Sequence, residues 1–346
     1  MNNIKKIQEK LIEKNLDAVL VTDEKNQRYA TGFPFTDGAV IVARSAAWLI
    51  TDSRYIEAAT NTAACCCNVQ MFDREHSRLS LIQAALKEAG VERLGAEEEK
   101  LSHAEYLGYE KALGMELLPA QAIFSELRAS KSEEEIGYLR EAQAISEKAL
   151  AEVLRIIKPG MTERQVAAEL VYRMLLNGSE GNSFDPIVIT GKKTSMPHGV
   201  PGDEVIHEGD FVTMDFGCLK HGYCSDMTRT VAIGYATDEM KNIYNIVLEA
   251  QLAGIAAARA GIPGYEIDAA ARNVITKAGY GQYFGHGFGH SLGLDIHELP
   301  GANLSGKAIM PVGCAVSAEP GIYIPGKFGV RIEDVMILHE NGAEVI

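Results

Sequence analysis

Residues 211–232 read FVTMDFGCLKHGYCSDMTRTVA, and this stretch holds two apolar strand patterns that each carry one aspartate. Asp215 lies inside the first apolar run and Asp226 leads into the second, with residues 217–223 between the two runs. An unpaired carboxylate is costly to bury in such a setting. The pattern therefore predicts a hairpin in which Asp215 and Asp226 face each other across adjacent strands and share a partner of opposite charge.

Two glutamates occur in similar surroundings further along the chain. Glu319 follows the apolar run AVSA and precedes Pro-Gly, and Glu333 interrupts the apolar run GVRIEDVMI. Any one of these acids alone would be explained by a surface ion pair or a turn cap. The four together favour a site for hard divalent cations, which prefer anionic oxygen ligands. Two cations that share bridging carboxylates and a water molecule would make the site hydrolytic.

Histidines are concentrated in the segment FGHGFGHSLGLDIHELP, residues 284–300, which contains His286, His290 and His297. The imidazole ring adds a donor that suits Mn, Fe, Co or Zn, and the glycines let the backbone approach a ligand closely. His198 follows a proline in Met-Pro-His-Gly and lies beside a rigid turn. The strand and helix context of a nucleotide-binding loop is weak here, so the segment favours catalysis.

The first third of the chain alternates between helix and strand patterns. Apolar spacing predicts helices near 4–16, 54–64, 78–89 and 102–112, with strands near 17–21, 38–43, 47–51 and 92–96. This alternation is typical of α/β structure. The sequence becomes polar and basic near 121–132, which predicts two domains, 1–122 and 123–346.

The rest of the chain mixes long helices with hairpin-like strands. The expected helices span 132–157, 162–177, 238–260 and 264–278, and the expected strands lie near 185–190, 210–217, 222–233, 313–318 and 329–338. Such mixing is typical of α+β folds.

Composition limits the class of protein. Of the 346 residues, 47% are hydrophobic and 23% are charged, as in ordinary folded proteins. The formal net charge of −14 disfavours nucleic acid or an acidic membrane surface as a partner. No export signal or membrane-spanning run is present, and the six cysteines form no CxxC pair, so we expect a cytoplasmic protein. Cys65, Cys66 and Cys67 are expected to pack as inert small residues at a helix end or loop.

The motifs of the second half resemble those of the Xaa-Pro dipeptidases (prolidases) and proline-specific aminopeptidases P, relatives of methionine aminopeptidase and creatinase. The resemblance covers about residues 120–346 and rests on PHG at 197–199, MDFG at 214–217, SDMTRT at 225–230, GHGFGH at 285–290 with IHE at 296–298, AEPGIY at 318–323 and VRIED at 330–334. It implies an α+β pita-bread catalytic domain preceded by a smaller, creatinase-like α/β domain.

Site residues follow from the same resemblance. It assigns Asp215, Asp226 and Glu333 to one metal ion, and Asp226, His290, Glu319 and Glu333 to a second. Manganese is the first expectation for both ions, with cobalt, iron or zinc as alternatives. Glu319 would also shuttle a proton, His198 and His297 would stabilise the reacting carbonyl, and His286 and Arg331 would contact the proline side of the substrate.

The expected function is therefore metal-dependent hydrolysis of the bond between an amino-terminal residue and proline, by a water or hydroxide that bridges the two metals. A homodimer is implied by the family. The alternative is a non-peptidase relative of the same fold, such as a creatinase-like amidinohydrolase or a binding protein. A methionine aminopeptidase is disfavoured because about 120 residues precede the catalytic motifs. The sequence leaves open whether dipeptides or longer peptides are cleaved, and which amino-terminal residue is preferred.

Overall fold

The computed structural model describes residues 2–346, which divide into two compact units between Leu127 and Arg128. The division falls inside helix α6 (Gln121–Ala129). The domain limits 1–122 and 123–346 stay a prediction. None of the helices within residues 2–346 is long and apolar enough to cross a membrane.

The first unit is a mixed six-stranded sheet with helices. Its strand order is β4-β3-β2-β1-β5-β6, in which β2 runs antiparallel to both neighbours and the remaining pairs are parallel. The strands are β1 (Ala18–Val21), β2 (Ala39–Ala43), β3 (Ala47–Thr51), β4 (Asn68–Met71), β5 (Leu94–Ala96) and β6 (Leu117–Pro119), and the helices before α6 are α1 (Ile4–Glu13), α2 (Glu24–Thr31), α3 (Ile56–Ala63), α4 (Arg78–Glu88) and α5 (His103–Leu113). The predicted α/β alternation is confirmed, although α2, β4 and β6 were not expected.

The three adjacent cysteines follow α3, at the expected helix end. Cys67 is buried and Cys65 is exposed, and all six cysteines of the chain are free thiols. Burial raises the pKa of the Cys66 and Cys67 thiols. Their function stays untested.

The second unit arranges four helices around several small sheets. The helices are α7 (Glu133–Val153), α8 (Glu163–Leu176), α9 (Asp238–Ala257) and α10 (Gly264–Lys277), with 3-10 turns η1 (Gly191–Ser195) and η2 (Gly281–Tyr283). Ser132 and Thr162 begin α7 and α8 with capping boxes, and the Thr237 side chain caps α9. The four helices confirm those predicted from spacing.

Strands of the second unit form sheets β11-β10-β7, β12-β9-β8, β14-β13-β15-β18-β19 and β16-β17. Their bounds are β7 (Gly181–Asn182), β8 (Ile187–Thr190), β9 (Phe211–Phe216), β10 (Cys218–Lys220), β11 (Tyr223–Cys224), β12 (Met227–Ala232), β13 (Gly289–Ser291), β14 (Glu298–Ala302), β15 (Ala315–Ala318), β16 (Gly321–Ile324), β17 (Phe328–Arg331), β18 (Asp334–His339) and β19 (Gly342–Val345).

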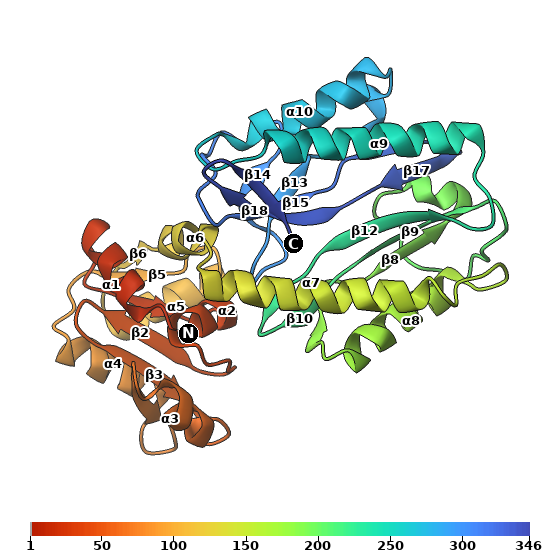
Figure 1. Cartoon of the computed structure of the whole chain (residues 1–346). Helices are drawn as coiled ribbons and strands as arrows, with labels where there is room; N and C mark the ends of the chain where they lie inside the picture. The colour runs from red at the N-terminus through yellow and green to blue at the C-terminus, as the bar shows by residue number, and fades with distance from the viewer. Residues whose placement is uncertain (1) are drawn as a thin grey trace. The chain divides into compact units, whose positions relative to one another are not determined.

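Two apolar cores hold these sheets between helices. One core joins α7 and α8 to β8, β9 and β12, and the other joins α9 and α10 to β15, β16, β17 and β18. Figure 1 shows the two helix pairs on opposite sides of the strands. On β9, Val212, Met214 and Phe216 belong to the first core, so the two-residue repeat of a strand turns Asp215 away from it.

Candidate metal centre

The two aspartates are brought together by the pairing of β9 with β12. Asp215 lies opposite Thr228 in this antiparallel pair. Asp226 precedes Thr228 by two residues, so it lies diagonally from Asp215 on the same side of the ladder. The intervening residues form the short β10–β11 pair rather than a simple turn. The predicted pairing of the two strands is therefore confirmed. The predicted register is corrected, because Asp215 lies opposite Thr228 and not opposite Asp226.

His290 comes from β13, and Glu319 directly follows the neighbouring strand β15. Ser317 on β15 connects them, because its hydroxyl accepts the His290 N–H (3.0 Å) and donates to Glu319 Oε1 (3.1 Å). The His290 Nε2 atom lies 3.5 Å from Asp226 Oδ2 and 3.4 Å from Glu319 Oε1. A Cβ at Gly289 would lie 1.9 Å from the Ser317 carbonyl oxygen. Gly289 thus permits the close approach of two strands. From the sequence, the glycines of this segment were expected to let the backbone approach a ligand.

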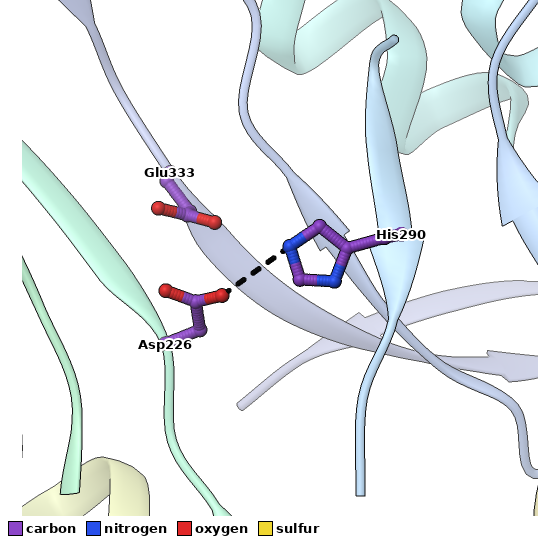
Figure 2. A group of neighbouring side chains, drawn as sticks. All are labelled: Asp226, His290 and Glu333. Atoms are coloured by element: carbon purple, nitrogen blue, oxygen red, sulfur yellow. Dashed lines mark ion pairs between the residues drawn. The ribbon is translucent and has the colours of Figure 1, made fainter. Parts of the chain in front are cut away.

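Glu333 lies between β17 and β18 and completes the group. Its main chain bridges to Thr228, and the Thr228 hydroxyl donates to Glu333 Oε2 (2.6 Å). One ligand atom from each of Asp226, His290 and Glu333 lies within 4.8 Å of the others. Figure 2 shows the two carboxylates and the imidazole pointing toward one another from three separate strands or loops.

The carboxylates of the group repel one another in a buried setting. Burial, followed by the nearby Asp215 and Glu319, raises the pKa of Asp226 well above its ordinary value. Burial and Asp226 do the same to the pKa of Glu333, and burial raises the pKa of Glu319 to about 7. Burial lowers the pKa of His290, which favours the neutral imidazole that can bind a metal ion.

These residues fit divalent cations. Four carboxylates and one neutral imidazole form the oxygen-rich donor set that Mn, Fe, Co and Zn accept. The Asp215 Oδ1 atom is buried and has no hydrogen-bond partner within residues 2–346. A bound cation would satisfy this oxygen and offset the repulsion among the acids.

A cavity of about 360 Å³ opens beside this group, within the second unit. It is lined by all five expected metal ligands, by His198, His286, His297 and Arg331, and by the apolar or small residues Phe184, Ile187, Pro197, Gly287, Gly289 and Ile296 together with Asn303. Every residue that the sequence assigned to the site therefore lines one cavity. Whether each performs its expected role stays a prediction.

The additional histidines occupy distinct positions in the cavity wall. The His297 ring lies 4.4 Å from the His290 ring, centroid to centroid. His286 pairs through Nε2 with the Tyr323 hydroxyl (2.9 Å), and burial lowers the pKa of His286 to about 4. Burial, with His290 and His198 nearby, also lowers the pKa of His297. Neutral imidazoles thus line the side of the cavity next to the acids.

Arg331 is held mainly by the protein itself. Its guanidinium pairs with Asp215 and donates to the Tyr323 hydroxyl (2.9 Å) and to the Thr228 hydroxyl (3.1 Å). Two further contacts to the Pro197 carbonyl oxygen are long, at 3.4 Å each. The acidic partner of Arg331 is therefore Asp215, which lies far away in sequence, and not Glu333 or Asp334, which lie close to it in the chain.

Comparison with known proteins identifies the family. A model of metallopeptidase family M24 matches residues 137–340, and a creatinase/prolidase amino-terminal domain model matches residues 3–130. The chain belongs to metallopeptidase family M24. It therefore combines a creatinase-like amino-terminal domain with the pita-bread catalytic domain, as the sequence predicted.

Individual members of the M24 family match over nearly the whole chain. A solved Xaa-Pro dipeptidase from Bacillus anthracis is 42% identical with a TM-score of 0.94, covering 99% of this chain and 96% of that one. An X-Pro aminopeptidase structure from Thermotoga maritima is 34% identical with a TM-score of 0.92, covering 98% and 96%. The Xaa-Pro dipeptidase of Pyrococcus horikoshii is 35% identical over 343 residues, which is 99% of this chain and 95% of the relative.

Sequence reasoning missed several polar residues that support this M24 centre. Thr228, Ser317 and Tyr323 each touch an expected site residue, and each lay inside a motif that was already singled out. These residues could have been found from the sequence as hydroxyl side chains within apolar strand patterns, because a buried hydroxyl needs a hydrogen-bond partner.

A second group that was missed is a buried ion network behind His297. The neighbouring Glu298 pairs with Arg128 and with Lys131 Nζ (3.1 Å), and Arg128 also pairs with Asp295 (2.6 Å). The Asp295 N–H donates to the Glu298 carboxylate (3.1 Å). The network therefore fixes the conformation of the loop that carries His297. Arg128 and Lys131 lie more than 160 residues away in sequence, and no local pattern could reveal this pairing.

Proposed function

We propose that this M24 metallopeptidase hydrolyses the peptide bond between an amino-terminal residue and proline. The convergence of Asp215, Asp226, His290, Glu319 and Glu333 on one cavity is the observation that carries the proposal. Support comes from relatives named Xaa-Pro dipeptidase or X-Pro aminopeptidase, which match this chain almost from end to end.

The five acidic and imidazole residues would hold two divalent cations, with Asp226 and Glu333 shared between them. When bound, such cations polarise a carbonyl group and lower the pKa of a water molecule. Manganese is our first proposal, because carboxylate-rich sites suit it.

Other side chains around the cavity would transfer the proton, stabilise the reacting carbonyl and contact the proline ring. The Glu319 carboxylate lies beside His290 and would take a proton from the attacking water and deliver it to the proline nitrogen as the bond breaks. The His198 and His297 rings line the same cavity and would donate hydrogen bonds to the carbonyl oxygen as negative charge develops there. His286 would pack against the proline ring.

Arg331 is the proposed partner for a free proline carboxylate. Its bonds to Asp215, Tyr323 and Thr228 are short, while its contacts to the Pro197 carbonyl are long. A substrate carboxylate could replace the long contacts without breaking the short ones, and a carboxylate is the stronger acceptor.

We also propose that the protein acts as a homodimer in the cytoplasm. The six free thiols support a reducing compartment. The dimer is testable by light scattering of the purified protein, in which a molecular mass of one chain would overturn it.

The test of function is a series of Xaa-Pro, Xaa-Pro-Xaa and longer peptides, assayed after chelation and after adding back Mn²⁺, Co²⁺, Fe²⁺ or Zn²⁺ singly. We expect metal-dependent release of the residue before proline, and no cleavage of matched Xaa-Ala peptides. Absence of Xaa-Pro cleavage with every metal would overturn the proposal. Cleavage of two-residue substrates alone would identify a dipeptidase.

A further inference from the structure

A buried carboxylate outside the metal centre closes the loop that carries His198. Glu163 lies in the first turn of α8 and is fully buried. Its Oε1 atom accepts the Thr190 N–H (2.9 Å), and its Oε2 atom accepts the Gly202 N–H (2.8 Å) and the Lys193 ammonium (2.6 Å). The Glu163 carboxylate thus has three donors, two of them from the main chain.

The two main-chain donors stand at opposite ends of one segment, which we call the His198 loop, residues 190–202. It includes the η1 turn and the Met-Pro-His-Gly motif. Next to the carboxylate, the Arg164 N–H donates to the Gly202 carbonyl and the Glu163 N–H donates to the Glu204 carbonyl, both at 3.1 Å. The start of α8 therefore fixes both ends of the His198 loop through one side chain and adjacent backbone groups.

The His198 imidazole lines the cavity, yet no hydrogen bond to its ring occurs within residues 2–346. Its place consequently depends on the backbone of the loop. That backbone is also restrained from the other side, since the Gly329 N–H donates to the Thr194 hydroxyl (2.9 Å). The Pro197 carbonyl faces the Arg331 guanidinium at 3.4 Å, so a shift of the loop would also alter the cavity wall.

A carboxylate that is fully buried is costly unless several donors satisfy it. Helix capping alone does not require this arrangement, because Thr162 already caps α8 with its own side chain. The three donors offset this cost, and the same bonds order the loop before substrate arrives. This order matters because catalytic groups lose much of their effect when they are displaced by about 1 Å.

We propose that Glu163 is a positioning residue for His198, and that Lys193 assists it by neutralising the carboxylate. This inference rests on the proposed Xaa-Pro peptidase function. Glu163 touches neither the substrate nor the proposed metal ligands. Its influence on the reaction passes through the His198 loop.

The test compares Glu163→Gln in the wild-type and His198→Ala backgrounds. Glutamine keeps the size and one oxygen but loses an acceptor for Gly202 and Lys193. We expect Glu163→Gln to lower kcat on an Xaa-Pro substrate by about tenfold to a hundredfold, with little change in metal affinity. In the His198→Ala background the same substitution should change kcat less than about twofold, because the group it positions is gone.

A matched control is Glu97→Gln in the first unit. Glu97 is also fully buried and accepts main-chain N–H groups, those of Thr22 (2.6 Å) and Asp23 (2.9 Å). We expect this control to lower the thermal midpoint without lowering kcat. An equal loss of kcat in the control, or an equal loss from Glu163→Gln in both His198 backgrounds, would overturn the inference.

Hydrogen–deuterium exchange supplies a readout that needs no activity. Faster exchange of residues 190–202 in Glu163→Gln, with α9 unchanged, is expected, and unchanged exchange would overturn the inference. If Glu163→Gln fails to fold, Lys193→Met takes its place, since it leaves both main-chain bonds intact, and it should show the same dependence on His198. Inactivity of the wild-type protein on every Xaa-Pro peptide would instead overturn the proposed function.

Discussion

Asp226 is the residue on which the proposed metal centre depends most. It lies within reach of His290 and shares the buried group with Glu333. Because we propose that Asp226 binds both cations, its loss should disturb both.

We predict that Asp226→Asn abolishes turnover and weakens metal binding by at least about a hundredfold, the upper range for losing even an outer partner of a metal ligand. Titration with Mn²⁺ against a chromophoric chelator measures the affinity. Asp238→Asn, at an exposed position on α9, is the control and should change neither quantity. Retained metal affinity in Asp226→Asn would contradict the assignment of Asp226 as a ligand.

Arg331 combines a structural contact with a proposed substrate contact. Arg331→Ala should lower kcat/KM on all substrates, because Asp215 loses its ion pair. The loss should be about tenfold or more greater for an Xaa-Pro dipeptide than for its carboxamide, since a charge-assisted hydrogen bond contributes about 1.5–3 kcal/mol. The comparison of acid and amide substrates is the measurement. Equal losses on both would rule out the carboxylate contact.

Among the structural elements, the loop between β13 and β14 is a second segment, besides the His198 loop, whose shape depends on buried charge. Glu298 has a side chain that is only 6% exposed, and Lys131 opposite it is 1% exposed. Burial alone would raise the pKa of Glu298, but Lys131 and Arg128 outweigh it and hold the pKa below its ordinary value. Asp295 and the Cys314 thiol also face this group.

We predict that Glu298→Gln lowers the free energy of unfolding by about 3–5 kcal/mol near pH 7, because Lys131 is left buried without its partner. A lowered folded-state pKa gives stability that is present above the ordinary value of 4.5 and is lost as the pH falls through the folded-state pKa. The gap in thermal midpoint between the wild type and the variant should therefore shrink below pH 4.5. A gap that stays constant down to pH 3 would contradict this account.

For the molecule as a whole, the candidate metal centre places four carboxylates close together inside a protein whose formal net charge is already −14. Buried acids that repel one another destabilise the folded state until a cation neutralises them. Metal binding should therefore be visible in global stability.

We predict that Mn²⁺ added to the chelated protein stabilises it by about 2.7 kcal/mol at a hundred times the dissociation constant. Calorimetry or dye-monitored melting measures the rise in midpoint. The effect should fade in acid, because protons compete for the carboxylates. In Asp226→Asn, most of the metal-induced rise in midpoint should be lost. A wild-type midpoint that does not change with Mn²⁺, Co²⁺, Fe²⁺ or Zn²⁺ would contradict a metal centre.

The sequence by itself predicted most of the helices and strands and the kind of chemistry proposed for the site. The apolar runs around Asp215 and after Asp226 predicted two strands, and these are observed as β9 and β12. The sequence also predicted α7 to α10, and all four helices are observed. These features are local, because each depends on residues within a few positions of one another. The edge strands β4 and β6 escaped prediction because none of the β4 residues is buried and the three-residue β6 ends in a proline.

Only the tertiary structure decided which groups pair across long separations. The register that places Asp215 opposite Thr228, the pairing of Arg331 with Asp215, the contact of Glu298 with Lys131 and the closure of the His198 loop by Glu163 each join distant positions. Side-chain type shows that a buried charge needs a partner, but packing selects the partner that lies within hydrogen-bond distance. For that reason the proposed ligands could be named from the motifs of the chain, and the residues that hold them in place could not.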